Sequence, residues 1–410
     1  MSNIREALQS DAGLLSLPIV AVMSDDADLT ERLVAALAGV ATVIRADPSS
    51  DAGLSVVEAT RPALVAVDAQ CFGNLLPDQV TRLRAILPNG LIVALGDEQD
   101  ADQVLAAVRA GAQDLVDRSM SELGLRRALR PRMERLPRGP QADRQAPCFA
   151  LLAARCEDRS REVALAIATA RAKQGKSVLL LDLTAGAPVL AMGLDMTARY
   201  GVGEALRDLD RLDGALLQSA VPRDQATGLS VLLLGSTEDL AEAGPGDLRA
   251  LVVLLRSLYA EIVLHLGDVT PQAPLLPLAA GLRRFGLVMT QSVASAAAAA
   301  TVLQALDQPG LARRERAVGI IAAHDGAVHL SADRIAAELE LDAPVLAPAP
   351  GAALLNALNA GTLSGFVAGS RPLQKMAAAV AGRLAEQKGA APAAMPRRGL
   401  RLALPWKRGQ

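Results

Sequence analysis

Residues 155–161 lie between an apolar segment that ends in two alanines and a segment that begins a helix near Glu162, which is the arrangement of a phosphate-binding loop. Such a loop needs glycines, because backbone N–H groups must approach the phosphate oxygens closely and some residues must adopt positive φ. It also needs a lysine that balances the phosphate charge. The loop reads Arg-Cys-Glu-Asp-Arg-Ser-Arg and contains neither residue type, so ordinary triphosphate binding is not expected here.

The charges of this loop allow two interpretations. Arg155, Arg159 and Arg161 could hold an anion by charge alone, whereas Glu157 and Asp158 would turn negative charge toward a negative ligand. The alternative, which we favour, is that the arginines are solvated and pair with neighbouring carboxylates, each exposed pair contributing less than about 1 kcal/mol. No serine, histidine and aspartate in the sequence have an order and spacing that indicate a hydrolytic triad.

The composition indicates two α/β domains. A chain of 410 residues is too long for one ordinary hydrophobic core. Hydrophobic residues form 51% of it and aromatic residues only 2%, which suits parallel α/β layers built from Ala, Val, Leu and Ile. The formal net charge of −2 gives no overall attraction for nucleic acid, so no nucleic-acid partner is expected.

The cysteines and the apolar segments bear on the compartment. Cys71, Cys148 and Cys156 lie far apart, without the spacing of a metal site or a disulfide framework, so a reducing compartment and no bound metal are expected. The first residues lack the basic and then apolar pattern of a signal peptide. No apolar run reaches the ~20 residues that span a bilayer. We therefore expect a cytoplasmic protein.

Short apolar segments alternate with amphipathic ones over the first third of the chain, which predicts a small doubly wound parallel sheet in residues 1–135. Proline, glycine and polar residues then interrupt the periodicity, so 136–147 is interpreted as a linker. The predicted strands are 19–23, 41–44, 64–67, 91–95 and 115–116, and the predicted helices are 28–38, 52–60, 78–87, 100–110 and 121–134.

A second alternating stretch covers residues 148–388 and predicts a larger α/β domain. The remaining segment, 389–410, is rich in Ala, Pro and Arg and is expected to be a flexible basic tail. Seven strands are predicted in this domain, at 149–153, 177–183, 229–234, 261–266, 284–290, 317–322 and 344–347.

Several segments match one known family in the same order along the chain. They are residues 24–26 and 65–68, 91–100 and 108–116, 177–183 with 193–195, 228–239, 288–295 and 348–361. With these segments the chain resembles the TadZ/CpaE proteins of the tight-adherence (Flp, type IVb) pilus system, which join an atypical receiver domain to a MinD/ParA-like ATPase domain. The resemblance covers nearly the whole chain. It implies a flavodoxin-like receiver fold followed by a P-loop NTPase fold.

The resemblance places Asp68 at the phosphorylated aspartate of receivers, with Asp25 and Asp26 at the acidic Mg²⁺ ligands. A working phosphoswitch also has a Thr or Ser after the fourth strand and a Lys after the fifth, because both side chains contact the phosphate. Gly96 and Asp117 stand at these two positions. Asp68 is therefore either a phosphorylation site or an ordinary strand-end carboxylate, and a pseudo-receiver is expected.

In the second domain the resemblance places the phosphate-binding lysine at Ser160, the Mg²⁺-binding hydroxyl at Arg161, and a signature lysine that reaches across the dimer at Arg155. Asp182 is retained after the second strand, and His265 replaces the acidic residue that orients Mg²⁺, an ion that prefers oxygen ligands. Phosphoryl transfer depends on positioning and charge neutralisation, so these losses predict a degenerate ATPase. The four residues other than His265 remain candidate nucleotide contacts. No catalytic residue and no cofactor are expected, and ATP binding is the alternative.

The resemblance implies a localisation and assembly factor that acts through protein surfaces, with pilus assembly and secretion proteins as partners. It would lie in the cytoplasm, at a cell pole or at the inner face of the membrane. A chain that does not bind ATP must form a homodimer without it, pair with an intact paralogue, or stay monomeric. The basic tail 389–410 is a candidate for peripheral membrane contact, against a solvated tail. Two alternatives stay open: an ATPase with an atypical nucleotide loop, and a signalling protein controlled at Asp68.

Overall fold

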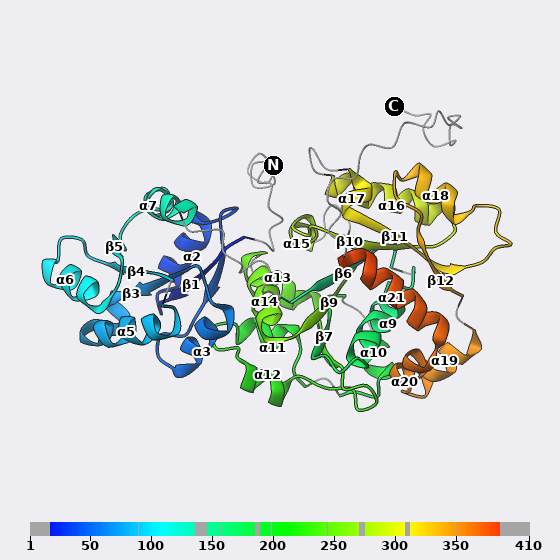
Figure 1. Cartoon of the computed structure of the whole chain (residues 1–410), viewed down its shortest axis with the longest axis horizontal. Helices are drawn as coiled ribbons and strands as arrows, with labels where there is room; N and C mark the ends of the chain where they lie inside the picture. The colour runs from blue at the N-terminus through cyan, green and yellow to red at the C-terminus, as the bar shows by residue number, and fades with distance from the viewer. Residues whose placement is uncertain are drawn as a thin grey trace.

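Two parallel α/β domains lie side by side in the computed structural model, the first coloured blue to cyan and the second green to red in Figure 1. The structure describes residues 17–88, 90–135, 146–156, 158–184, 189–197, 199–243, 245–269, 275–307, 312–349 and 351–385. The predicted tail and nearly all of the predicted linker lie outside these residues. Within them, no helix has the length and apolar character to cross a bilayer.

The first domain contains a five-stranded parallel sheet in the order β2-β1-β3-β4-β5, which is the order of flavodoxin-like folds. The strands are β1 (Ile19–Met23), β2 (Thr42–Arg45), β3 (Leu64–Asp68), β4 (Leu91–Gly96) and β5 (Asp114–Asp117). The helices are α2 (Ala27–Ala36), α3 (Asp51–Thr60), α4 (Ala69–Phe72), α5 (Leu76–Ile86), α6 (Ala101–Ala110) and α7 (Glu122–Arg135), with a 3₁₀ turn η2 (Gly73–Leu75).

The second domain contains a seven-stranded parallel sheet in the order β12-β11-β10-β6-β9-β7-β8. Its strands are β6 (Cys148–Ala153), β7 (Val178–Asp182), β8 (Ser230–Leu233), β9 (Glu261–Asp268), β10 (Phe285–Met289), β11 (Ala317–His324) and β12 (Val345–Pro348). All twelve predicted strands are confirmed. They could be found because both faces of a parallel sheet are covered by helices, so its strands are continuous apolar runs.

The helices of the second domain cover both faces of its sheet. They are α9 (Ser160–Ala172), α10 (Val189–Gly193), α11 (Val202–Arg207), α12 (Gly214–Ala220), α13 (Thr237–Glu242), α14 (Pro245–Leu258), α15 (Leu276–Ala280), α16 (Val293–Leu306), α17 (Arg313–Arg316), α18 (Ala332–Glu338), α19 (Ala352–Asn359), α20 (Leu363–Gly369) and α21 (Arg371–Ala385).

Helix α9 is central to the second domain. Every residue from Val163 to Ala168 is buried, and α20 and α21 pack against the side that faces away from the sheet. Figure 1 shows α21 beside α9. Alanine occupies half of this buried stretch, so the neighbouring helices can approach closely at little cost in helix propensity. The start of α9, where its first N–H groups lie, is therefore held in a fixed position.

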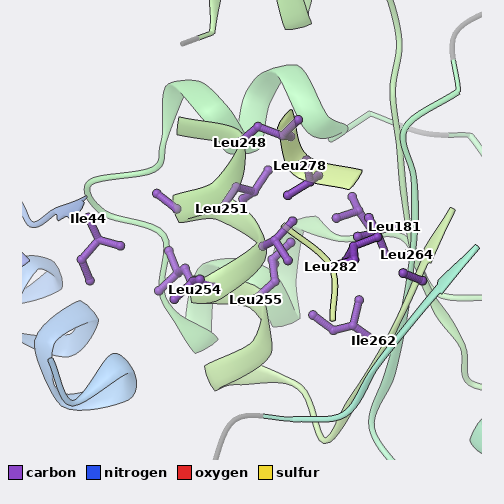
Figure 2. Close-up of a cluster of buried hydrophobic side chains, with 14 of the residues drawn as sticks. Ile44, Leu181, Leu248, Leu251, Leu254, Leu255, Ile262, Leu264, Leu278 and Leu282 are labelled. Atoms are coloured by element: carbon purple, nitrogen blue, oxygen red, sulfur yellow. The ribbon is translucent and has the colours of Figure 1, made fainter. Parts of the chain in front are cut away.

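Helix α14 joins the two domains through one hydrophobic cluster. It covers its own sheet with Leu251 and Leu255, while Ile44 of the edge strand β2 lies toward Leu254 on its other side (Figure 2). Outside the cluster, the Asp47 amide donates to the backbone oxygen of Asp210 at 2.9 Å. Because these contacts cover an edge strand, they also protect unpaired backbone groups of the receiver-like sheet.

Candidate functional site

The site lies where three neighbouring strands of the seven-stranded sheet end. Strand β6 leads into the loop 154–159 and then into α9, which begins at Ser160. Strand β7 ends in Asp182, and the register of β7 with β9 places Asp182 directly beside His265. Because parallel strands present their carboxyl ends at one edge, these three side chains converge there.

Ser160, His265 and Asp182 form a continuous chain of buried hydrogen bonds. The Ser160 Oγ lies 2.7 Å from the Nε2 atom of His265, and the Nδ1 atom of His265 lies 2.8 Å from an Asp182 oxygen. The three residues are 4%, 2% and 3% exposed, respectively. A neutral imidazole with its proton on Nδ1 satisfies both contacts, because it then donates to the carboxylate and accepts from the serine hydroxyl.

Arg161 and Thr184 also hold Asp182 by hydrogen bonds. The Arg161 Nε donates to it at 3.2 Å, and Thr184 donates through its amide at 3.0 Å and its hydroxyl at 2.6 Å. Burial by itself raises the pKa of Asp182, but the contacts with His265, Thr184 and Arg161 outweigh this effect and lower the pKa to about 2. The carboxylate is therefore ionised at every physiological pH.

A local irregularity in β9 makes room for this network. The pairing of β9 with β6 skips one residue just after His265, which is a β-bulge. Gly267 then adopts a φ of +66°, and a Cβ at this position would lie only 2.4 Å from the Thr184 Cγ2. Glycine is thus required at 267 both by its backbone conformation and by the close approach of Thr184.

A cavity of about 610 Å³ opens beside the network. Ser160, Arg161 and His265 lie in its wall, together with Arg159. The rest of the described wall is mixed in character and consists of Cys156, Glu162, Thr184, Val189, Leu190, Gly267, Asp268, Gly351, Ala352, Leu354, Leu355, Leu358 and Leu363. Arg155 does not belong to this lining, so of the four predicted nucleotide contacts the structure brings together Ser160, Arg161 and Asp182.

The acidic part of the loop corrects one expectation. Asp158 does not turn its charge toward a ligand, because it is 1% exposed and its oxygens accept from Thr290 at 3.2 Å and from Ser295 at 2.7 Å. It thereby fastens the loop to the end of β10, through Thr290, and to the first turn of α16, through Ser295. The expected pairing of loop arginines is seen between Arg159 and Glu162, at 3.9 Å. Glu157 lies outside the described residues.

A magnesium–nucleotide complex, which the resemblance implies, does not fit these residues. Both oxygens of Asp182 already accept from protein donors, and both ring nitrogens of His265 are engaged. Arg159 adopts a φ of +59° just before α9. A glycine at such a position has no side chain and would let an anion approach the backbone N–H groups more closely than Arg159 does. The site therefore lacks available oxygen ligands for Mg²⁺ at these positions.

The receiver-like site around Asp68 is closed as well. Asp68 is fully buried, and it accepts from the Ser24 hydroxyl at 2.7 Å and from the Gln70 amide at 3.0 Å. Sequence reasoning missed the cation, which is Arg118 and follows β5 directly. Its guanidinium lies 3.2 Å from Asp68 and 2.9 Å from Asp26. Asp117, which was assigned the position of the receiver lysine, instead accepts from the amide of Ser119 and has a lowered pKa.

Among the residues that the structure describes, Asp25, Asp68 and Cys71 are the one group with metal-ligand spacing. Burial, followed by the hydrogen bond to Asp25, raises the pKa of the Cys71 thiol to about 12. The thiol is therefore protonated at neutral pH, and a thiol binds a metal as the thiolate. Because Arg118 also neutralises Asp68, this group is poorly suited to a divalent cation.

The order and spacing of residues along the sequence did not indicate that Ser160, His265 and Asp182 lie in contact. Ser160, Asp182 and His265 lie far apart in the sequence, and only the parallel register of β6, β9 and β7 joins them. The available signal was chemical. Asp182 ends an apolar strand, His265 is a polar residue in the second half of another, and Ser160 begins the helix that follows a third; such residues of parallel strands meet near one edge of the sheet.

Comparisons with family models and with curated proteins gave no match. Among solved structures, the chain is similar to a ParA family ATPase from Chlorobium tepidum TLS, with 20% identity and a TM-score of 0.50 over 57% of this chain and 98% of that chain. The MinC:MinD cell division protein complex from Aquifex aeolicus matches with 18% identity and a TM-score of 0.46 over 60% and 98%. A CheY-like protein (tadZ) from Pseudomonas aeruginosa PAO1 matches with 26% identity and a TM-score of 0.26 over 29% and 96%.

These likenesses concern the fold. The ParA likeness accounts for the seven-stranded sheet, and the order of the five-stranded sheet is that of receivers. The expected architecture is therefore confirmed: a domain with the strand order of receivers is followed by a domain with the fold of a ParA family ATPase.

Proposed function

We propose that this protein is a localisation and assembly factor of a tight-adherence pilus system that does not hydrolyse ATP and acts through its surfaces. The proposal that the protein does not hydrolyse ATP rests on the closed hydrogen-bond network of Ser160, His265, Asp182 and Arg161. We infer that these side chains, which satisfy one another, occupy the place where phosphates and a metal would otherwise bind. The pilus assignment rests on the sequence resemblance and on the two-domain architecture.

The closed network opposes nucleotide binding in two ways. To admit Mg²⁺, Asp182 would have to give up buried hydrogen bonds to His265 and Thr184, each of which leaves an unpaired donor that costs about 1–3 kcal/mol. To admit a γ-phosphate, Arg161 would have to leave Asp182 unneutralised in a buried position. The loop also lacks the glycines that let backbone N–H groups approach several phosphate oxygens closely.

The receiver-fold domain supports a role without phosphorylation. Asp68 is already paired with a cation by Arg118, and no oxygen of Asp68 is exposed to a phosphodonor. We propose that this domain recruits a partner in a constant conformation. The partners would be pilus assembly and secretion proteins.

Calorimetric titration of ATP and of ADP with Mg²⁺ into the full chain tests the proposal, with the native mass measured in both conditions. We expect no saturable binding tighter than about 1 mM and no change of mass. Micromolar binding with dimerisation would contradict the proposal. If the protein is instead an ATPase with an atypical arginine loop, it should bind ATP, and Arg155→Ala should weaken that binding. A constant mass of two chains would indicate a nucleotide-independent homodimer, whereas a constant mass of one chain would leave a monomer or a partnership with a paralogue.

Localisation tests the pilus assignment separately. A fluorescent fusion expressed in the native cell is expected at a pole or at the inner face of the membrane. Deletion of the gene for this protein is expected to abolish surface pili. The tail contributes to membrane contact if removal of residues 389–410 releases the fusion into the cytoplasm. Normal piliation in the deletion strain would refute the assembly role.

A further inference from the structure

The network of Ser160, His265 and Asp182 carries an inference beyond the assembly role. The serine contacts one ring nitrogen of the histidine and the aspartate contacts the other, at 2.7 and 2.8 Å. This is the order and the geometry of a Ser-His-Asp hydrolytic triad. We propose that Ser160 is a nucleophile that forms an acyl-enzyme with carboxylic esters bound in the adjacent cavity.

The assignment of roles follows from which atoms meet. His265 receives the hydroxyl proton on Nε2, and Asp182 holds the ring by its Nδ1–H and stabilises the imidazolium that forms. Thr184 and Arg161 bind Asp182 from other directions, so the carboxylate cannot rotate away from the histidine. Thr184 and Arg161 are therefore positioning residues rather than catalytic ones.

The fold supplies an electrophilic group beside the nucleophile. Ser160 is the first residue of α9, a helix of 13 residues, so the peptide N–H groups of the first turn lie next to its side chain. These groups carry the partial positive charge of the helix N-terminus and stabilise negative charge that develops on a carbonyl oxygen. Strand, turn, serine and helix thus follow one another as in enzymes whose nucleophile sits between a strand and a helix.

The cavity indicates the class of substrate. Its volume of about 610 Å³ suits a small molecule, and its wall on the side of α10, α19 and α20 is apolar, with Leu190, Leu354 and Leu358. Arg159 and Arg161 lie at the polar side. An ester with a short apolar acyl chain matches this lining.

The reaction conserves atoms and charge at each step. The Ser160 Oγ forms a bond to the carbonyl carbon while its proton moves to His265 Nε2, and the bond from carbon to the leaving oxygen breaks as His265 returns the proton to that oxygen. Water then attacks the acyl-serine, with His265 taking a proton from the water and giving it back to Ser160. The products are an alcohol and a carboxylic acid, and no cofactor is required.

Labelling with an alkyl fluorophosphonate tests the nucleophile directly on the full-length protein. The reagent loses fluoride and leaves a phosphonyl group on an activated serine, which intact-mass and peptide spectra detect. We expect one adduct, located on Ser160, and hydrolysis of p-nitrophenyl butyrate that the same reagent inhibits. An unlabelled wild-type protein, or a label on any other residue, would overturn the proposal, because a purely structural network does not activate its serine.

Labelling rates of variants show whether His265 activates Ser160 or whether Ser160 is only accessible to the reagent. His265→Gln is expected to lower the labelling rate of Ser160 by about 100-fold or more, which is the usual contribution of a general base. Ser219→Ala, at an exposed serine of α12, is the matched control and is expected to label at the wild-type rate. Unchanged labelling of Ser160 in His265→Gln would overturn the assignment of a base. Urea unfolding curves of each variant show whether a lost label reflects a lost fold.

Discussion

Replacing Asp182 by asparagine removes the charge at the centre of the buried network. The carboxylate accepts four hydrogen bonds, from His265, from Arg161 and from both the amide and the hydroxyl of Thr184. The asparagine side chain keeps one oxygen, but its NH₂ group is a donor that faces other donors. The buried Arg161–Asp182 ion pair is lost at the same time.

The structure gives the size of the effect in two parts. The pKa of Asp182 falls from 3.8 to about 2, and at about 1.36 kcal/mol per pH unit this corresponds to about 2 kcal/mol of folding free energy from the charge. One further buried donor left unpaired costs about 1–3 kcal/mol. We therefore expect Asp182→Asn to lower the free energy of unfolding of this domain by about 3–5 kcal/mol, in the range for breaking a buried ion pair.

Urea unfolding followed by circular dichroism measures this difference at several pH values. The pKa of Asp182 is lowered on folding, so its charge stabilises the protein fully above pH 3.8 and progressively less as the pH falls toward 2. The gap between wild type and Asp182→Asn should therefore narrow by about 2 kcal/mol between pH 5 and pH 2. Asp333→Asn, at an exposed aspartate in α18, is the control and should change stability by less than about 0.5 kcal/mol. A gap equal to that of the control, or one that does not depend on pH, would refute the reasoning.

Three further predictions concern other parts of the chain. Gly53→Ala should lower the free energy of unfolding by about 2 kcal/mol or more, because its Cβ would lie 2.0 Å from a backbone oxygen, whereas Gly365→Ala, with open space around it, should be neutral or stabilising in the same denaturation assay. Glu261→Gln should cost about 3 kcal/mol by calorimetry, since Glu261 is 1% exposed and pairs with two cations, and a loss below 1 kcal/mol would contradict a buried ion pair. Acetyl phosphate with Mg²⁺ should add no mass to the wild-type protein, and Arg118→Ala should gain Mg²⁺ binding by titration; phosphorylated Asp68 in the wild type would contradict the closed pocket.

The sequence predicted the secondary structure well because the residues of each strand are buried by both neighbouring layers. Strands such as β3 and β7 are uninterrupted apolar runs, and polar loops separate them from amphipathic helices. The two fold types came from the family resemblance, whereas the order of strands within each sheet is seen only in the structure, since apolar runs do not say which strand pairs with which.

The candidate sites were only partly predictable. Arg118 immediately follows β5, yet its role depends on a guanidinium that spans from that strand end to Asp68 on β3. Asp158 was expected to face a ligand and instead bonds to Ser295, more than a hundred residues away in sequence. For both Arg118 and Asp158, the contact depends on the direction in which the side chain points. That direction depends on tertiary packing and cannot be read from the sequence.

By itself, the sequence determined that the loop 155–161 lacks the glycines and the lysine of a phosphate site, because those requirements are properties of residue types. It could not determine what replaces them. The tertiary structure decided that Ser160, His265 and Asp182 meet in hydrogen-bonding distance, since the register of β9 with β7 and the bulge after His265 set the relative positions of side chains from distant segments. Composition restricts the chemistry available to a chain, and the pairing of its strands selects which residues perform it.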